Sequence, residues 1–217
     1  MHDNEALALR LERIEAYQQI QNVMGHYAYF HTANMHRECM ELFALDTPGV
    51  RAEMMWGVYE GRDGLERLYP GFHHWVDGDG VGKMHMHALT TPVIEVSADG
   101  QTAKAIWLSP GHETMSFTPG AENEAAWAWM KYGCDFIKEN GVWKIWHLHV
   151  YGIFMAPYSK SWVESAMDEM PAPEMPDHFL ADKPPTTGWT YHPSKLYPKN
   201  EPTVPEPFDK WDPSTEF

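Results

Sequence analysis

Residues 125–156 read AAWAWMKYGCDFIKENGVWKIWHLHVYGIFMA, and this stretch decides the fold class. It contains two runs rich in aromatic and β-branched residues, 125–139 and 142–156, separated by Asn140-Gly141. An Asn-Gly pair between two such runs is a strong hairpin signal, because both residues tolerate the positive φ angles that a tight turn requires. The sequence therefore predicts two long antiparallel strands here.

Earlier segments have the same strand-like character. They span 83–96 and 102–115 and are joined by the turn sequence Ser97-Ala98-Asp99-Gly100. Four successive strands with short connections predict an antiparallel meander. A further strand is expected before it, at 50–59.

The N-terminal part of the chain reads as helix. Segment 4–33 carries a stripe of residues at spacings of three and four, which is typical of a helix with one buried face. The stripe comprises Tyr17, Ile20, Met24, Tyr27 and His31. Shorter helices are expected at 35–45 and at 65–75, the second between a turn at 60–64 and a glycine-rich loop at 76–80. Helices followed by strands predict an α+β layer fold, with helices on one concave face.

The C-terminal segment differs in composition. Eleven of the 17 prolines lie between Pro171 and Pro213, so we predict a domain at 1–170 and an extended tail at 171–217. A last helix is expected just before the tail, at 159–169. Because the tail is also rich in aromatic residues, we expect it to lie across its own domain or a partner subunit.

Composition narrows the function. The chain has 16 Lys and Arg against 31 Asp and Glu, a net charge of −15. Such a chain repels phosphate backbones and anionic lipid, so neither nucleic acid nor membrane is an expected partner. The sequence shows no bilayer-spanning run and no secretory signal, and Cys39 and Cys134 are too few for a disulfide framework. We therefore expect a cytoplasmic protein with reduced thiols.

Three histidines are the first candidates for chemistry, because imidazole exchanges protons near neutral pH. His87 lies in one predicted strand, His112 ends the next, and His31 ends the helical stripe. Neighbouring antiparallel strands can bring side chains to one space, so we expect the three rings to converge on a pocket. A hydrogen-bonded structural histidine is the alternative for each of them.

Two histidine pairs raise the question of a metal. His85 and His87 alternate onto one strand face, and so do His147 and His149, as metal ligands can. The next glutamate after His87 is Glu95, which is too far along the chain for a cupin ligand set. We expect no metal and no other cofactor, and we expect His147 and His149 to serve packing or a subunit contact.

The other candidates would line the pocket. Tyrosine can fix or protonate a substrate oxygen, so Tyr132 is a further catalytic candidate. Lys131 is either a buried base or one half of an outer-face ion pair with Asp135. The expected substrate-binding residues are Tyr27, Trp56, Tyr59, Trp107, Met130, Lys131 and Leu148. Core packing is the alternative for the aromatic ones.

Several catalytic signatures are absent from the sequence. It has no G-x-S-x-G elbow, no G-x-G-x-x-G after a strand, no phosphate-binding G-x-x-x-x-G-K-[ST] and no Cys-x-x-Cys. These absences argue against a hydrolase of the nucleophile-elbow type, a nucleotide-dependent enzyme and a thiol redox protein.

Four short motifs follow one another along the chain: YAYFHT at 27–32, YEGRDG at 59–64, HALTTPVIE at 87–95 and GVWKI at 141–145. In this order they resemble the SnoaL-like branch of the nuclear transport factor 2-like superfamily, over about residues 12–156. The resemblance implies a cone, in which a curved antiparallel sheet wraps a central pocket that helices close.

The resemblance also implies roles for single residues. Two pocket histidines, a pocket tryptophan and a pocket asparagine of scytalone dehydratase fall, in that order, at His87, His112, Tyr27 and Tyr132. That enzyme has a tyrosine and an aspartate where this chain has His31 and Thr32. The aspartate that orients its histidine base is therefore missing here, so another group takes over or the protonation roles differ.

From this resemblance we expect a cofactor-independent lyase that acts on a bulky aromatic, phenolic alcohol. It would work by acid–base dehydration or by retro-aldol loss of a small aldehyde such as formaldehyde. His87 would be the base, and His112, His31 or a tyrosine such as Tyr132 the proton donor. An isomerase or cyclase of a polyketide or steroid-like ring, or a non-catalytic binding module, remains the alternative. The superfamily also implies a homodimer or higher homo-oligomer that associates through the outer sheet face.

Overall fold

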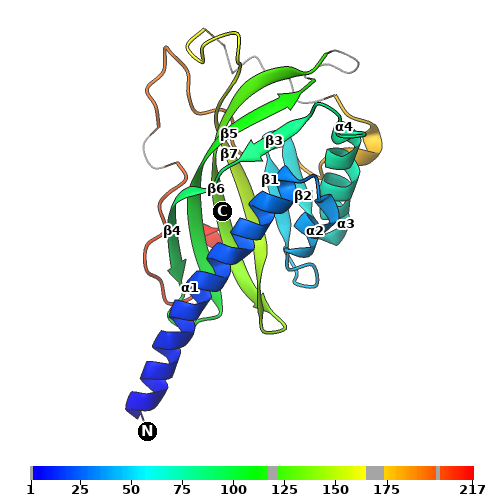
Figure 1. Cartoon of the computed structure of the whole chain (residues 1–217). Coiled ribbons are helices and arrows are strands. Elements are labelled where there is room, and N and C mark those ends of the chain that lie inside the picture. The colour runs from blue at the N-terminus through cyan, green and yellow to red at the C-terminus, as the bar shows by residue number, and fades with distance from the viewer. Residues whose placement is uncertain (1, 117–121, 165–173, 199–200) are drawn as a thin grey trace.

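The structure, a computed structural model, describes residues 2–116, 122–164, 174–198 and 201–217. These residues form a seven-stranded curved sheet in the order β2-β1-β7-β6-β5-β3, with β4 also paired to β5. The long helix α1 (His2–Thr32) crosses the concave side of the sheet (Figure 1). The predicted α+β cone with helices on its concave face is therefore confirmed. No helix in the described ranges combines the length and apolarity needed to cross a membrane.

The predicted hairpin forms the centre of the sheet. Strands β5 (Thr102–Met115), β6 (Glu124–Glu139) and β7 (Val142–Pro157) pair antiparallel over most of their length. Between β6 and β7 the φ angles of Asn140 and Gly141 are 52° and 80°. Both values lie in the left-handed region that the Asn-Gly pair favours, as the sequence predicts.

The segment predicted as one strand at 83–96 is broken in two. Strands β3 (Met84–His87) and β4 (Thr90–Val96) both pair with β5. Thr91 has a φ of 47°, the residue after it is Pro92, and the register shifts between Thr90 and Val93. These irregularities lie inside β4, where Pro92 cannot donate a ladder hydrogen bond, whereas the break between the two strands falls at Ala88 and Leu89.

The predicted strand at 50–59 is likewise a short hairpin. Strand β1 (Arg51–Met54) pairs antiparallel with β2 (Gly57–Glu60). Strand β1 also pairs with β7, with Arg51 opposite His147, and this pairing is parallel. The sheet therefore departs from a pure antiparallel meander at this edge.

The N-terminal helix confirms the predicted stripe except at its start. Ile20, Met24 and Tyr27 are buried, but Tyr17 is 41% exposed. The buried face begins with Ala16 and continues with Ile20, so Tyr17 lies beside this face, and the first turns of α1 extend beyond the edge of the sheet (Figure 1). The second helix, α2 (His36–Glu41), is shorter than predicted, since Phe43 already pairs with Ile145 of β7 as an isolated bridge.

A continuous helical stretch follows β2. It consists of α3 (Gly61–Glu66), a π-helical turn η1 (Arg67–His73) and α4 (His74–Asp77). The turn predicted at 60–64 is wrong, because helix begins at Gly61. The stretch ends at Gly78, whose φ of 58° suits a helix C-terminus. This later end carries Asp77, expected in a loop, into the helical layer.

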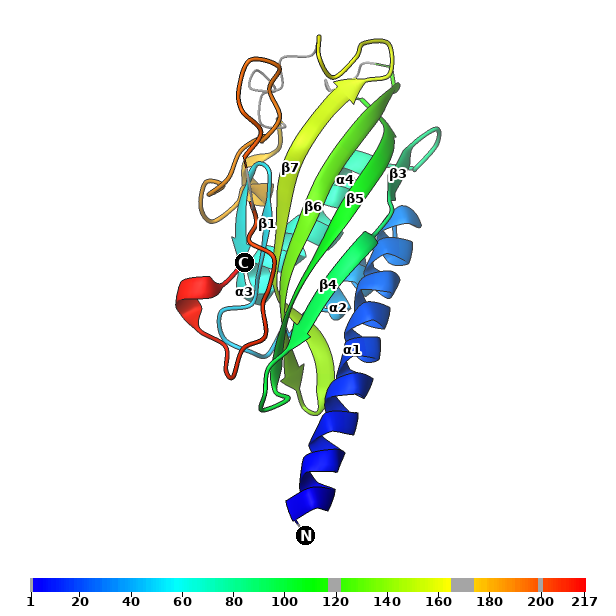
Figure 2. The same cartoon turned by 90° about the vertical axis from the view of Figure 1, so that its left-hand side faces the viewer.

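The C-terminal residues lie along the outer face of their own sheet, beside β1 and β7 (Figure 2). They contain the 3₁₀ turns η3 (Asp177–Phe179) and η4 (Pro213–Thr215). Lys183 forms a bridge with Val58 of β2. The boundary predicted at 170/171 and most of the helix predicted at 159–169 lie outside the described residues, and the described start of that helix forms turns.

Candidate active site

The inner face of β3 carries two histidines that the strand register aligns with β5. His85 lies opposite Glu113 and His87 opposite Gly111, and both histidines and Glu113 are buried. Met86 lies opposite His112, and both of these are exposed. Side chains alternate along a strand, so His112 points to the other face of the sheet.

The prediction that His112 shares a pocket with His87 is therefore wrong. The ring of His112 packs instead on Trp127, with ring centroids 4.9 Å apart. The sequence placed His112 at the right end of β5 but on the wrong face, because a shift of one residue inverts every side chain of a strand.

Glu113 holds His87. Nε2 of His87 lies 2.9 Å from Oε1 of Glu113. Burial would raise the pKa of Glu113, but the hydrogen bond from His87 outweighs burial and lowers that pKa below its ordinary value. An ionised Glu113 accepts a hydrogen bond, so Nε2 of His87 carries a proton, and in the neutral ring the lone pair is then on Nδ1. Glu113 thus takes the orienting role that the resemblance left vacant.

Gly111 gives the ring of His87 its place. A Cβ atom at Gly111 would lie 2.5 Å from Nδ1 of His87, closer than any real contact. The ring therefore packs closely against the backbone of β5 at Gly111, where only glycine leaves room. Nδ1 of His87 is buried and has no hydrogen-bond partner among the described residues.

His31 lies at the centre of a histidine cluster. Its ring centroid is 5.5 Å from that of His73, 5.7 Å from His87 and 6.2 Å from His85. Burial lowers the pKa of His31 well below its ordinary value, and the neighbouring rings of His73 and His87 lower it further. His31 is therefore neutral at physiological pH. The predicted convergence of His31 with His87 is confirmed.

Asp77 joins two further histidines. Its Oδ2 lies 2.7 Å from Nε2 of His36, and its Oδ1 lies 2.8 Å from Nε2 of His85. Burial would raise the pKa of Asp77, but the hydrogen bonds from both histidines hold that pKa well below its ordinary value. Sequence reasoning missed Asp77 and His36. The helical stretch ends at Asp77, two residues beyond the predicted end at 75, and no apolar spacing signals this extension.

Aromatic rings surround His73, which lies in η1. The ring of His73 lies 5.2 Å from Tyr69 and 6.3 Å from Trp56. Burial, reinforced by the neighbouring His36, lowers the pKa of His73 to about 3. His73 is thus a second neutral imidazole beside His31. It lay in a predicted helix and was not singled out from the sequence.

Three buried tyrosines adjoin the histidine cluster. The hydroxyls of Tyr27 and Tyr69 are 3.1 Å apart, and the ring of Tyr132 lies 6.1 Å from that of Tyr27. Burial raises the pKa of each of the three. They therefore stay protonated and can donate hydrogen bonds to a ligand oxygen. Tyr27 and Tyr132 lie where the sequence places them.

The other predicted lining residues, apart from Lys131, divide into two groups. Trp56 donates a hydrogen bond of 3.0 Å to the hydroxyl of Tyr59, and both lie next to η1. Trp107 and Leu148 are buried in the main core, against which Met130 packs. Core packing, the alternative considered for the aromatic residues, thus describes Trp107.

Lys131 lies on the outer face and not in the cluster. Its Nζ donates to the main-chain oxygen of Glu201 at 2.5 Å and lies 5.4 Å from the ring of Tyr197. The ion pair predicted between Lys131 and Asp135 is wrong, because Asp135 pairs with Lys104 at 2.8 Å. A buried-base role for Lys131 is equally excluded by its contacts with the tail.

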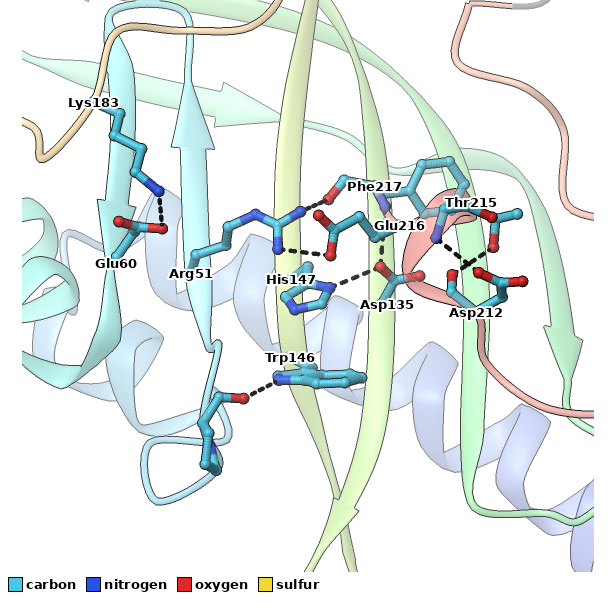
Figure 3. Close-up of polar contacts among 12 residues, drawn as sticks. Arg51, Glu60, Asp135, Trp146, His147, Lys183, Asp212, Thr215, Glu216 and Phe217 are labelled. Atoms are coloured by element: carbon cyan, nitrogen blue, oxygen red, sulfur yellow. Dashed lines mark hydrogen bonds and ion pairs between the residues drawn. The ribbon is translucent and has the colours of Figure 1, made fainter.

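The second histidine pair also lies under the tail. Nδ1 of His147 donates to Asp135 at 2.8 Å, and the same carboxylate accepts from the backbone N–H of Phe217 at 3.0 Å (Figure 3). His149 contacts Oγ1 of Thr187 at 2.9 Å. These contacts agree with the packing role expected for the pair.

Several nitrogens of the cluster are buried and unpaired. Within the described ranges, Nδ1 is buried without a hydrogen-bond partner in four of its histidines: His31, His36, His73 and His87. Each such atom costs on the order of 1–3 kcal/mol unless a ligand pairs with it. No group of three or more His, Cys, Asp or Glu among the described residues is arranged to hold a metal ion. The cluster thus offers an oriented base, neutral imidazoles and hydroxyl donors to a polar ligand.

Comparison with known proteins gives one family. The SnoaL-like domain matches residues 12–149. No curated protein sequence matches the chain. Among solved structures, a candidate scytalone dehydratase from Novosphingobium aromaticivorans DSM 12444 is 16% identical with a TM-score of 0.53, covering 69% of this chain and 92% of its own. The LinA-type3 hexachlorocyclohexane dehydrochlorinase from Novosphingobium barchaimii LL02 is 16% identical with a TM-score of 0.56, covering 70% and 96%. At these identities the likeness shows the fold.

Proposed function

The chain belongs to the SnoaL-like domain family, and from this premise we propose that it is a cofactor-independent lyase acting on a bulky phenolic alcohol. The observation that carries the proposal is the His87–Glu113 pair, in which Nδ1 of His87 is left as a free lone pair. A carboxylate that fixes the tautomer and orientation of an imidazole is a recurrent design for a general base.

The surroundings suit an elimination. His87 would remove a proton from carbon or from a hydroxyl, and a second group would protonate the departing oxygen. The neutral ring of His31 and the hydroxyls of Tyr27 and Tyr132 can hold substrate oxygens. Dehydration and dehydrochlorination are both eliminations, so the names of the two structural relatives are compatible with this reaction class.

An aromatic substrate is favoured by the walls. Tyr69, Phe72 and Trp56 flank His73, and rings of this kind stack on an aromatic ligand. A phenol on the substrate would supply electrons through a quinone-methide-like intermediate. The bond that is aligned with the aromatic ring would then break. The identity of that bond decides between loss of water and retro-aldol loss of formaldehyde.

The test is product analysis after chelator-treated protein is mixed with a panel of phenolic diols. We expect a new long-wavelength absorbance band, together with either a product lighter than its substrate by one water or a released aldehyde, both detected by mass spectrometry. A product isomeric with its substrate would replace the lyase by an isomerase or cyclase. Tight binding without any product would support a non-catalytic module.

A further inference from the structure

Two carboxylate–histidine pairs lie side by side in the cluster. Strand β3 places His85 and His87 two residues apart on the same inner face. Each donates through Nε2 to a different carboxylate, His87 to Glu113 at 2.9 Å and His85 to Asp77 at 2.8 Å. The two pairs approach from opposite sides, since Glu113 belongs to β5 and Asp77 to the helical layer.

The ring of His31 contacts the histidine of each pair. Its ring is 5.7 Å from His87 and 6.2 Å from His85. A substrate that pairs with the free nitrogen of His31 would therefore have one histidine–carboxylate pair on each side. An elimination needs that arrangement, because one group accepts a proton while another donates one.

We propose that His85, positioned by Asp77, is the proton donor to the departing oxygen, opposite the base His87. This inference rests on the proposed lyase function and assigns a role that the function alone leaves open. Asp77 touches no substrate and is a positioning residue.

The proton balance is complete. Protonated His85 donates Nε2–H to Asp77, which leaves Nδ1–H for the substrate. As Nδ1 of His87 takes the proton from carbon, the C–O bond breaks, a double bond forms, and Nδ1 of His85 gives its proton to the oxygen that leaves as water. His87 ends protonated and His85 neutral, and exchange of one proton between them restores the starting state.

The charges around His85 favour this role. Burial lowers the pKa of His85, but the hydrogen bond to Asp77 and the nearby Glu113 carboxylate outweigh both burial and Lys83 and raise that pKa. His31 contacts the ring of Tyr27 as well as imidazoles of the cluster, and burial together with those imidazoles lowers its pKa. His85 is thus the better proton carrier at neutral pH.

His36 offers a matched control. It is bonded to the same carboxylate as His85, through the other oxygen, at nearly the same distance. Its neighbouring rings are His73 and His74, at 5.7 and 6.3 Å, and not His31.

The first experiment follows the histidine titrations by ¹⁵N NMR in wild type, Asp77→Asn and His36→Gln, without substrate. We expect the pKa of His85 to lie above the ordinary value of about 6.5. It should fall in Asp77→Asn and change little in His36→Gln. A His85 that titrates at or below the ordinary value in wild type would overturn the proposal, whatever the activity.

The second experiment compares two leaving groups, a phenolic β-hydroxy ketone and the matching β-chloro ketone, because chloride departs without a proton. His85→Gln should lose about 10²- to 10⁴-fold in kcat on the alcohol and remain near wild type on the chloride. His87→Gln should lose activity on both, and the exposed His112→Gln, on the other face of the sheet, on neither. Equal losses on both substrates in folded His85→Gln would contradict a donor role. A wild type inactive on both would instead defeat the lyase proposal itself.

Discussion

At the residue scale, the orientation of His87 depends on one carboxylate. Glu113→Gln keeps the shape of the side chain but replaces the ionised acceptor, so the tautomer of His87 is no longer fixed. We expect kcat to fall by roughly 10²-fold with little change in KM. Steady-state kinetics measure this. The exposed Glu124→Gln on β6 is the control, and equal kinetics of the two variants would remove Glu113 from the mechanism.

The buried histidines make stability depend on pH. The folded-state pKa of His73 is about 3, below the ordinary value in an unfolded chain. Below pH of about 6.5 the unfolded chain therefore binds a proton that the folded protein rejects, and stability is lost as pH falls. Urea unfolding at pH 7 and pH 5 should show a smaller loss for His73→Gln than for wild type, by about 1–2 kcal/mol. The exposed His74→Gln should behave as wild type.

Single residues of the site were predictable where a periodic pattern fixed their face. His31 follows from the helical stripe, and His87 from alternation along a strand. His112 was expected on the inner face, where Glu113 lies instead. The sequence predicts the strand but does not fix its register to within one residue. Asp77 was missed because the end of a helix is set by contacts, here with His36 and His85, and not by its apolar spacing.

At the element scale, residues 177–183 are built into the edge of the fold. The hydroxyl of Tyr59 donates to the oxygen of Phe179 at 3.1 Å, and the backbone N–H of Glu60 donates to Asp182 at 2.8 Å. Glycine makes room for the segment. A Cβ atom at Gly71 would lie 2.9 Å from the ring of Phe179.

Two glycine substitutions should therefore have opposite effects. Gly71→Ala should displace Phe179 and destabilise the protein by on the order of 1 kcal/mol or more. Gly25→Ala, within α1, meets no atom within 4 Å and should stabilise by about 0.5–1 kcal/mol. Thermal unfolding measures both, and limited proteolysis should show faster cleavage near Phe179 in Gly71→Ala. A stabilised Gly71→Ala would mean that the segment is not docked as described.

The regular elements were largely predictable, and their interruptions were not. The Asn140-Gly141 turn and the three long strands follow from local propensity. The break between β3 and β4 falls at Ala88 and Leu89, which are not turn residues, and the irregularity at Thr91 and Pro92 lies inside β4. The parallel pairing of β1 with β7 joins segments far apart in the chain, and no local pattern encodes it.

At the scale of the whole molecule, the tail covers charged groups on the outer face. Nζ of Lys104 donates to Asp135 at 2.8 Å and to the main-chain oxygen of Thr215 at 2.5 Å. Arg51 donates to the main-chain oxygen of Phe217 at 2.6 Å and pairs with Glu216 at 3.3 Å (Figure 3). Sequence predicted that the tail would lie on a domain, but its path depends on these polar partners and has no periodic signal.

Removal of the buried carboxylate of Asp135 should destabilise the folded protein. Asp135→Asn leaves Lys104 buried without its counter-ion, and we expect a loss of about 3–5 kcal/mol in the free energy of unfolding. Chemical denaturation measures it. The exposed Asp209→Asn in the tail is the control and should be nearly neutral. A nearly neutral Asp135→Asn would show that the tail does not bury this pair in solution.

The most direct test of the central claim compares His87→Gln with His112→Gln on one phenolic diol that wild type converts. The two histidines lie on neighbouring strands but on opposite faces of the sheet. With His87 as the base on the inner face, His87→Gln should lose about 10²- to 10⁴-fold in kcat while His112→Gln keeps the wild-type rate. Full activity of a folded His87→Gln, or an equal loss in His112→Gln, would contradict it.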